Sequence, residues 1–434
     1  MTTYATSPGG SRDVLAADVF KYACIAFCVA NAGIVLSAWL AASGPNDFVG
    51  VWAAGRLALD GQPQAAYDWS AHKTVEDLAA GSPFEGTYPW LYPPSFLLVA
   101  TVLALVPYGL AHLMWPIVTS AAYLVSIRAI IQHRTAILLA AAFPGAMANL
   151  VAEQNGFLSA GLFGGALVLM ERSPVLSGCL LGLLSYKPQF GVLIPLALIA
   201  GGRWRVLCSA AAVAVALAAV SWVAFGTATW AAFGSAIFGA TRVVLADHAA
   251  NWHKLQTVFG LVRALGGSET TAWSLQAATI VACAGLTWMT WHRTIAFQLQ
   301  AAALVAASLL ATPYMYIYDL VVLAIPMAFL VELGRTGGFR PGEIGGLAAV
   351  SLLVLSYPLV EAPVGLAATL IVTWLVARRA FPIGLRRRIA RGRPPCDGQP
   401  STEFPHVPPY GSRAEAAARL HREPHRPRQR EAPR

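Results

Sequence analysis

Residues 44–69 read GPNDFVGVWAAGRLALDGQPQAAYDW, and the same polar stretch ends at residues 87–94 with TYPWLYPP. It is the first long polar interruption in a chain that is otherwise mostly apolar. Between positions 44 and 92 there are six carboxylates and two basic residues. Asp47 lies near the start, just beyond the first apolar run. We therefore expect a loop at a membrane surface, with Asp47 as its chemical centre.

The composition indicates a membrane protein. The chain is 57% hydrophobic and 12% charged, whereas a soluble domain carries about 25% charged residues. Apolar runs recur along most of it, which predicts an all-α, polytopic membrane bundle of about 12 transmembrane segments. The expected parts are a disordered N-terminus (1–18), a membrane domain (19–377) that includes the first outer loop (43–93), and a disordered tail (378–434).

The positive charge lies in the tail. After residue 377 there are 14 arginines and 5 acidic residues, which gives the whole net charge of +9. A basic chain can bind nucleic acid, but a Pro-rich tail after the last apolar segment favours a cytoplasmic tail that obeys the positive-inside rule. Read backward from that tail, the apolar segments alternate and place the first loop outside.

The threading has two open points. The run 19–42 could be a signal peptide, but it exceeds the 7–15-residue apolar core of one, so we expect a retained helix. Residues 95–106 either cross the membrane or only dip into it before the longer run 110–131. About 12 residues span only ~18 Å, so we favour the dip.

The first loop should contain two short helices, about 48–60 and 70–80, with Asp68 or Ser70 as a cap of the second. Asp47 could cap the first helix or act as a general base, and the two roles are compatible. The six cysteines show no metal-ligand spacing and are expected to be core residues, and no metal site is predicted.

Lys187 lies in LSYKPQFG between two short apolar runs. The proline after it breaks the helix, and broken helices at membrane depth are tolerated where they line a wet cavity. Lys187 could bind a phosphate with help from Gln189, or it could be a lysine that reaches the membrane surface from a helix end.

Three further polar groups could line the same pocket. Each also has a simpler reading, as a turn, a surface loop or an interface belt of aromatic residues. Gln154 and Asn155 could hydrogen-bond a saccharide, and Asp319 is costly at the start of a membrane segment. The candidates from these groups are Gln154 and Asn155; Asn251, His253 and Lys254; and Tyr314 and Asp319.

Several motifs together resemble glycosyltransferase family 87, also called DUF2029, in the GT-C class of integral membrane glycosyltransferases. Its best-known members are polyprenyl-phosphate-mannose-dependent alpha-mannosyltransferases. The ordered set is fairly specific, although no single motif is decisive. The matching stretches are NDF (46–48), AAGRLALDGQPQAAYD (53–68), YPP (92–94), EQNGFLSAGLFGGAL (153–167), SGCLLGLLSYKPQFGVLIPL (177–196), NWHKLQTVFGLVRAL (251–265) and TPYMYIYDLVVLAIP (312–326).

The resemblance implies an enzyme without a cofactor that transfers a hexose from a polyprenyl-phosphate donor to a glycolipid or glycan. Asp47 would be the catalytic base of an inverting displacement on the outer face of the inner membrane, and Lys187 would lie near the donor phosphate. Arg56 and Tyr92 lie in the matching stretches and complete the expected substrate-binding set. The family's mannosyltransferases tend to carry a Trp-x-His pattern after the late proline. This chain has YIYD at 316–319, so mannose is only one possible sugar.

Two other functions stay open. A flippase or transporter would move lipid-linked sugar without any transfer chemistry. A polymerase or ligase of surface polysaccharide would use a lipid diphosphate donor.

Overall fold

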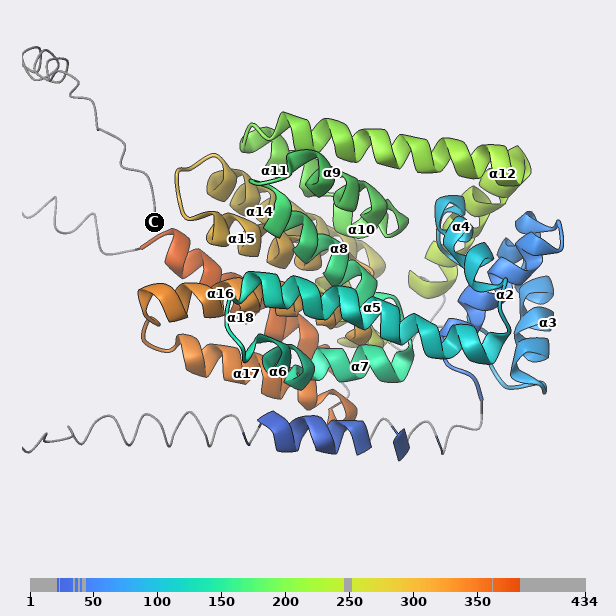
Figure 1. The fold of residues 1–434 in the computed structure, drawn as a ribbon, viewed down its shortest axis with the longest axis horizontal. Coiled ribbons are helices and arrows are strands. Elements are labelled where there is room, and N and C mark those ends of the chain that lie inside the picture. Colours follow the sequence, from blue (N-terminus) through green and yellow to red (C-terminus); the bar gives the residue numbers. More distant parts are fainter. Residues whose placement is uncertain are drawn as a thin grey trace, which may run out of the picture. The chain divides into compact units, whose positions relative to one another are not determined.

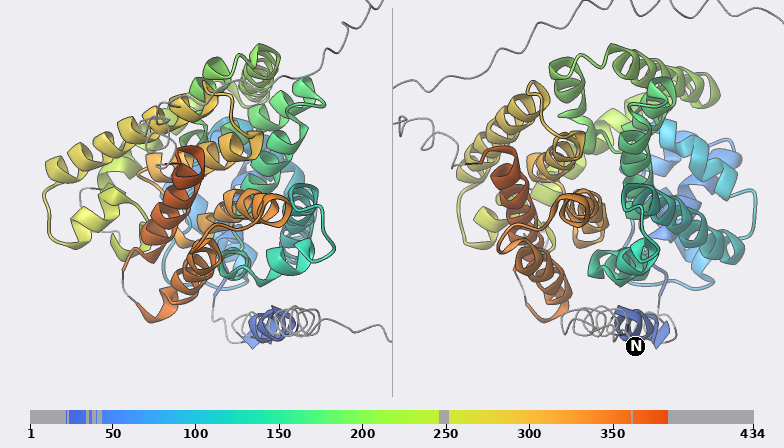
Figure 2. Two further views of the ribbon diagram at one scale, coloured as in Figure 1. Left: turned by 90° about the vertical axis from the view of Figure 1, so that its left-hand side faces the viewer. Right: turned by 60° about the vertical axis from the view of Figure 1, so that its left-hand side comes forward.

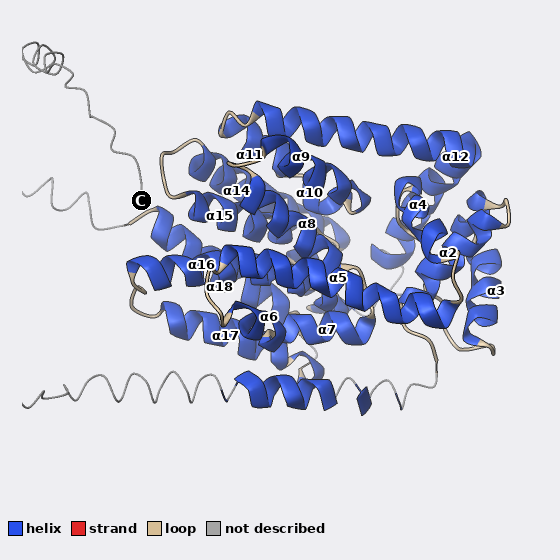
Figure 3. Ribbon diagram, in the orientation of Figure 1, coloured by secondary structure: helices blue, strands red, loops and turns tan. Residues whose placement is uncertain are grey.

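The computed structural model is helical throughout the residues that it describes (Figure 3). These are residues 22, 24–33, 36–37, 40, 44–245, 252–360 and 362–382. Within those ranges no strand occurs, and an isolated antiparallel bridge pairs Leu255 with Tyr316. The expected all-α class is confirmed. The expected segment 1–18 and nearly all of the expected tail lie outside the described residues.

The first loop folds into short helices, as predicted. They are α2 (Phe48–Leu59), the 3₁₀ helix η1 (Pro63–Tyr67) and α3 (Trp69–Ala80), followed by α4 (Pro94–Leu103). Asp68 caps α3, because its Oδ1 accepts hydrogen bonds from the backbone N–H groups of Ser70 and Ala71 at 2.9 and 3.0 Å. α2 packs against α4 where Gly55 meets the Ala100 carbonyl, a place with no room for a Cβ.

The remaining helices form the bundle, and most are short because glycine or proline interrupts them. They are α5 (Tyr108–Ile130), α6 (Ala136–Ala142), α7 (Pro144–Ala152), α8 (Gly156–Leu169), α9 (Pro174–Leu183), η2 (Leu184–Tyr186), α10 (Pro188–Gly191), α11 (Ile194–Ala200), α12 (Trp204–Leu245), η3 (Trp252–Lys254), α13 (Val258–Ala264), α14 (Glu269–Trp291), α15 (Phe297–Ala311), η4 (Ile317–Leu323), α16 (Ala324–Gly337), α17 (Glu343–Leu355), η5 (Tyr357–Leu359) and α18 (Val364–Ala380).

Four of the described helical stretches are long and apolar enough to cross a membrane: Tyr108–Ile130, Trp204–Gly239, Glu269–Trp291 and Ile317–Gly337. Several shorter apolar helices accompany them, and α4 at 10 residues would span only ~15 Å. The expected count of about twelve crossings depends on how these shorter helices pair, so it stays a prediction.

Small residues allow the helices to pack closely. α15 lies in the centre, with nearly every residue from Leu299 to Ala311 buried. α8 packs on α5 where Gly161 and Gly164 face Ala122 and Ser126. Membrane helices are held together by such close packing, since lipid provides little hydrophobic drive between them. α17 and α18, orange and red, lie side by side in Figure 2.

The structure adds a helix that the sequence patterns do not predict. The alternation of apolar segments places residues 226–270 outside as one stretch, and residues 226–245 of that stretch continue α12 after a break at Gly226, where φ is 76° and ψ is 171°. This backbone conformation is essentially restricted to glycine. The second half of α12 then covers the first loop, where Phe233 lies 5.8 Å from Tyr67 between ring centroids.

Basic side chains gather at the end of the bundle opposite the first loop. In Figure 1, α2 and α3 lie at the right and the ends of α16 and α18 at the left. Arg379 binds Glu343 at 2.5 Å, Arg340 donates to the Arg378 carbonyl at 2.7 Å, and the Arg293 guanidinium lies 4.9 Å from the Phe381 ring. The two ends of the bundle therefore differ in charge.

Candidate active site

Asp47 is held by a residue far away in the sequence. It immediately precedes α2, yet its side chain makes no cap bond to that helix. Its Oδ2 instead accepts a hydrogen bond from Nε2 of Gln154 at 2.7 Å. The capping alternative for Asp47 is therefore wrong, and the carboxylate is turned toward the polar turn between α7 and α8.

Gln154 connects Asp47 to the rest of the site. Its Oε1 accepts from the Tyr92 hydroxyl at 3.1 Å and from the Asn155 backbone N–H at 3.3 Å. The Tyr92 carbonyl in turn accepts from the Tyr67 hydroxyl at 2.9 Å. Both polar ends of the Gln154 amide are thus occupied, so its orientation is fixed and its N–H faces the carboxylate.

The turn that carries Gln154 is tightly built. Gly156 donates its N–H to Oδ1 of Asn149 at 2.8 Å, and a Cβ on Gly156 would lie 2.6 Å from the Tyr318 carbonyl oxygen. Only glycine fits there. This close approach brings the YIYD stretch of 316–319, which is distant in sequence, against the turn.

The Asn155 side chain is a buried amide with unused hydrogen-bonding capacity. It is fully buried, and neither of its amide atoms has a hydrogen-bond partner of good geometry among the described residues, although the Tyr92 hydroxyl lies nearby. An unsatisfied buried amide lowers the stability of a protein by roughly 1–3 kcal/mol. A substrate hydroxyl or a bound water would satisfy it.

Lys187 and Asp319 form a buried ion pair. Nζ of Lys187 lies 2.6 Å from Oδ1 of Asp319, and the two side chains are 4% and 3% exposed. Oδ2 of Asp319 also accepts the Tyr316 backbone N–H at 3.2 Å. The ammonium lies 5.6 and 5.5 Å from the ring centroids of Phe190 and Tyr318. Lys187 therefore reaches a phosphate only if Asp319 shares its ammonium.

Lys254 is the exposed cation of the site. It ends η3, and the next residues are anchored by the Leu255–Tyr316 bridge and by the Gln256 N–H, which donates to the Met315 carbonyl at 2.7 Å. Oε1 of Gln256 accepts from the Gly365 N–H at 2.8 Å. These bonds hold the Lys254 segment beside the YIYD stretch.

The environment raises the proton affinity of Asp47. Burial raises the pKa of its half-buried carboxyl to about 6, the hydrogen bond from Gln154 and the charges of Lys254 and Lys187 oppose that rise, and Glu153 adds to it. A carboxylate with such a pKa is ionised at neutral pH and still a useful proton acceptor. The charges of both lysines act on Asp47, so these three groups face a common region.

The other predicted residues are placed differently. Arg56 forms an exposed ion pair with Asp60 at 2.8 Å, and the structure does not bring it to Asp47. Gln189 is half-buried in α10 next to Lys187, and His253 precedes Lys254. Tyr314 packs with Leu255 in a small apolar cluster. Asn251 lies outside the described residues.

Sequence reasoning missed two contributors to this site. The Tyr186 hydroxyl lies 2.7 Å from the Ser159 hydroxyl and donates to the Asn155 carbonyl at 3.1 Å, so it supports the turn from below. His112, on α5, lies 2.9 Å from Glu153. A lone histidine in an apolar helix was the available signal, and it does not reveal its partner.

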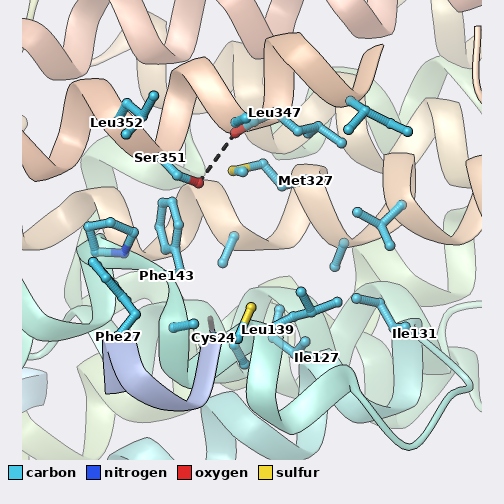
Figure 4. Close-up of a pocket in the computed structure, with 18 of the residues that line it drawn as sticks. Cys24, Phe27, Ile127, Ile131, Leu139, Phe143, Met327, Leu347, Ser351 and Leu352 are labelled. Atoms are coloured by element: carbon cyan, nitrogen blue, oxygen red, sulfur yellow. Dashed lines mark hydrogen bonds between the residues drawn. The ribbon is translucent and has the colours of Figure 1, made fainter. Parts of the chain in front are cut away.

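A large apolar cavity lies apart from these polar groups (Figure 4). Its volume is about 670 Å³, and its walls include Cys24 and Phe27 of the N-terminal helix, Phe143, Met327 and Ser351. The Ser351 hydroxyl already donates to the Leu347 carbonyl at 3.3 Å. Nothing polar in these walls would hold water, so the cavity suits a hydrocarbon chain.

The fold and the site describe an all-helical membrane protein in which a carboxyl group, Asp47, lies in the field of Lys187 and Lys254. The family model of glycosyltransferase family 87 matches residues 90–313, slightly more than half of the chain. The chain belongs to glycosyltransferase family 87, and it is a glycosyltransferase. The match includes Gln154, Lys187 and Lys254 but begins after Asp47. No curated protein and no solved structure matches the chain.

Proposed function

We propose that this glycosyltransferase moves a hexose from a polyprenyl-phosphate donor to a glycolipid or glycan acceptor, with Asp47 as the general base. The observation that carries the proposal is the Asp47 carboxylate, which is held at 2.7 Å by Gln154, has a pKa raised to about 6 and lies in the field of two lysines. Mannose is one candidate hexose.

The reaction needs one base and a stabilised leaving group. Asp47 takes the proton of an acceptor hydroxyl while that oxygen forms a bond to the anomeric carbon. The bond from that carbon to the phosphate oxygen breaks on the opposite face, so the configuration inverts and the lipid phosphate leaves with the electron pair. Positioning and charge stabilisation supply most of the rate in such a displacement.

Of the two lysines whose charges act on Asp47, Lys254 is the one available for the leaving phosphate. Lys254 is exposed and needs no rearrangement to meet it. Lys187 is buried and its charge is already neutralised by Asp319, so we assign it a structural role beside the site. Asn155, whose amide atoms lack partners of good geometry, is assigned to a sugar hydroxyl.

The apolar cavity supports a lipid-linked donor. Phe143 and Pro144 line the cavity at the start of α7, and the end of α7 leads into the turn that carries Gln154. The nine residues of α7 extend ~14 Å. A long isoprenoid chain whose phosphate lies at the lysines would have ample length to reach the cavity.

The charge distribution supports an active site on the outer face of the inner membrane. The arginines gather at the end opposite Asp47, and the positive-inside rule assigns such an end to the cytoplasm. The tail after residue 382 would then also be cytoplasmic.

The proposal is tested with the full chain in proteoliposomes and a panel of polyprenyl-phosphate and polyprenyl-diphosphate sugars with glycolipid acceptors. We expect product from a monophosphate donor, loss of it in Asp47→Asn, and normal transfer in Asp60→Asn, whose carboxylate is exposed and pairs only with Arg56. Movement of lipid-linked sugar between leaflets without product would indicate a flippase. A requirement for diphosphate donors would indicate a polymerase or ligase.

A further inference from the structure

Glu153 has an unusual backbone conformation. Among the described residues it is the only one other than glycine with a positive φ, at φ 54° and ψ 32°. A side chain in this left-handed region costs about 1–2 kcal/mol, and glycine would avoid that cost. The position lies between α7 and Gln154. Strain retained beside a candidate catalytic base points to a role for the Glu153 carboxylate.

The Glu153 carboxylate reaches across to α5. Its Oε2 lies 2.9 Å from Nδ1 of His112, and the side chains of Glu153 and His112 are only 8% and 14% exposed. The contact lacks the alignment of a hydrogen bond, so the close approach of two nearly buried polar groups is what joins the two side chains. It therefore connects the turn between α7 and α8 to the outer part of α5.

The His112 ring also packs against the helix that follows Asp47. It meets the ring of Phe48 nearly edge-on, with centroids 6.3 Å apart and planes at 68°, and Tyr108 lies 5.6 Å from it. Phe48 directly follows Asp47 and is fully buried. One imidazole thus touches the residue before Gln154 and the residue after Asp47.

We propose that the Glu153–His112 pair is a positioning device for Asp47, which holds the left-handed turn so that the Gln154 amide is aimed at the base. The Tyr92 hydroxyl holds the Gln154 amide within the turn, and the pair adds a connection from this turn to the helix that follows Asp47, 107 residues away from Gln154. Glu153 and His112 act through Gln154 and Phe48, and neither contacts the reacting atoms. This inference rests on the proposed role of Asp47.

The pair also affects the charge around Asp47. The negative charge of Glu153 raises the Asp47 pKa, while Lys254 and Lys187 lower it. Four tyrosines also lie within reach of the Asp47 charge, namely Tyr88, Tyr92, Tyr316 and Tyr318. Since these phenols are neutral near pH 6, Glu153 is the neighbouring anion whose removal should lower the Asp47 pKa.

The test combines two measurements: the rate of sugar transfer, and a chemical modification that does not require the enzyme to be active. Glu153→Gly keeps the left-handed turn and removes the carboxylate, and His112→Leu removes its partner. We expect each to lower kcat by roughly tenfold with little change in KM, and the double variant to lose no more than either alone, because the two groups act as a unit. His112→Gln, which can still donate to Glu153, should recover part of kcat.

The second readout is modification of Asp47 by a hydrophobic carbodiimide, which attacks protonated carboxyls, followed by mass spectrometry across pH. In Glu153→Gly the midpoint should move to lower pH by roughly half a unit, as expected for loss of one charge several ångströms away in a partly screened site. Glu171→Gln and His133→Gln, at the other end of the bundle, should match the wild type in both readouts.

The outcomes separate this inference from the proposed function. Wild-type kcat and an unmoved midpoint in Glu153→Gly would show that Glu153 only ends a helix, and additive losses in the double variant would show that the two residues do not act together. If the wild-type protein transfers no sugar from any donor, the pH midpoint of carbodiimide modification can still be compared between the wild type and Glu153→Gly. A shift then supports the pairing although the proposed reaction fails.

Discussion

Each neighbour of Asp47 shifts the pKa of its carboxyl group in a direction that its chemistry explains. Burial and Glu153 favour its protonated form, whereas Gln154 and the two lysines favour the carboxylate. The result is a carboxyl group that is ionised at neutral pH and becomes protonated near pH 6. At the residue scale, the pH at which activity is lost should therefore change when a single neighbour of Asp47 is replaced.

We predict that sugar transfer falls about tenfold per pH unit as the pH drops below about 6, because only unprotonated Asp47 can accept a proton. In Gln154→Leu the loss of a hydrogen bond to the carboxylate raises the Asp47 pKa, so the fall should begin at higher pH. The measurement is kcat/KM between pH 5 and 8. Gln64→Leu, an exposed glutamine on η1, should keep the wild-type profile, and an unchanged profile in Gln154→Leu would contradict the hydrogen-bond assignment.

The Lys187–Asp319 pair gives a second prediction at this scale. Lys187→Met leaves the Asp319 charge buried and should destabilise the protein by about 3–5 kcal/mol, whereas Lys187→Met with Asp319→Leu should recover most of that loss. Thermal unfolding in detergent measures both. If Lys187 has only a structural role beside the site, the double variant also regains part of its transfer activity. A stable double variant without activity, together with an active Lys254→Met, would assign the phosphate to Lys187 instead.

At the scale of helices, glycine residues determine where two helices can pack closely against each other. α9 lies on α12 where Gly178 faces Ser209 and Val206, and a Cβ on Gly178 would overlap the Ser209 hydroxyl and the Val206 carbonyl oxygen. α9 leads through η2 directly to Lys187. Packing far from the site therefore influences where Lys187 lies.

We predict that Gly178→Ala destabilises the protein by about 1–3 kcal/mol, because the added methyl group forces α9 away from α12. Gly285→Ala, on α14, adds the same group where nothing lies within 4 Å and should be neutral or slightly stabilising. Unfolding temperatures in one detergent compare the two. Equal losses would mean that helix propensity, rather than the contact with α12, controls the effect.

At the scale of the whole molecule, the polar site and the apolar cavity are separate places connected by α7. The site gathers Asp47 from the first loop, Gln154 from the α7–α8 turn, Lys187 from just before α10 and Asp319 from η4. The cavity lies among the N-terminal helix, α5, α6, α7, α16 and α17. A donor with a charged head and a long apolar chain matches this arrangement.

We predict that filling the cavity with Ala328→Phe raises KM for a long-chain polyprenyl-phosphate donor several-fold and leaves kcat nearly unchanged, since Ala328 lines the cavity and Asp47 and the two lysines do not. A donor with a short prenyl chain should be used as well as by the wild type. Ala282→Phe, exposed on α14, serves as the control. An equal rise in KM for long and short donors would remove the cavity from the donor site.

The sequence alone determined the class of fold, most helix positions and the family. Apolar runs, the breaks at proline and the cap at Asp68 are local patterns, and they predicted α2, α3 and α5 to within a few residues. The ordered motifs predicted the family that the chain belongs to. Local patterns missed the continuation of α12, because a stretch with three further glycines or serines among small residues after Gly226 is as typical of a loop as of a broken helix.

The tertiary structure alone decided what the candidate residues touch. Asp47 looked like a helix cap, and 107 residues separate it from the glutamine that holds it. Lys187 looked like a free cation, and Asp319, 132 residues away, neutralises it. Residue identity gives the charge and size of a side chain, but its partner depends on how helices pack. That packing is set by distant small residues such as Gly156, where the close approach of two backbones is possible only without a side chain.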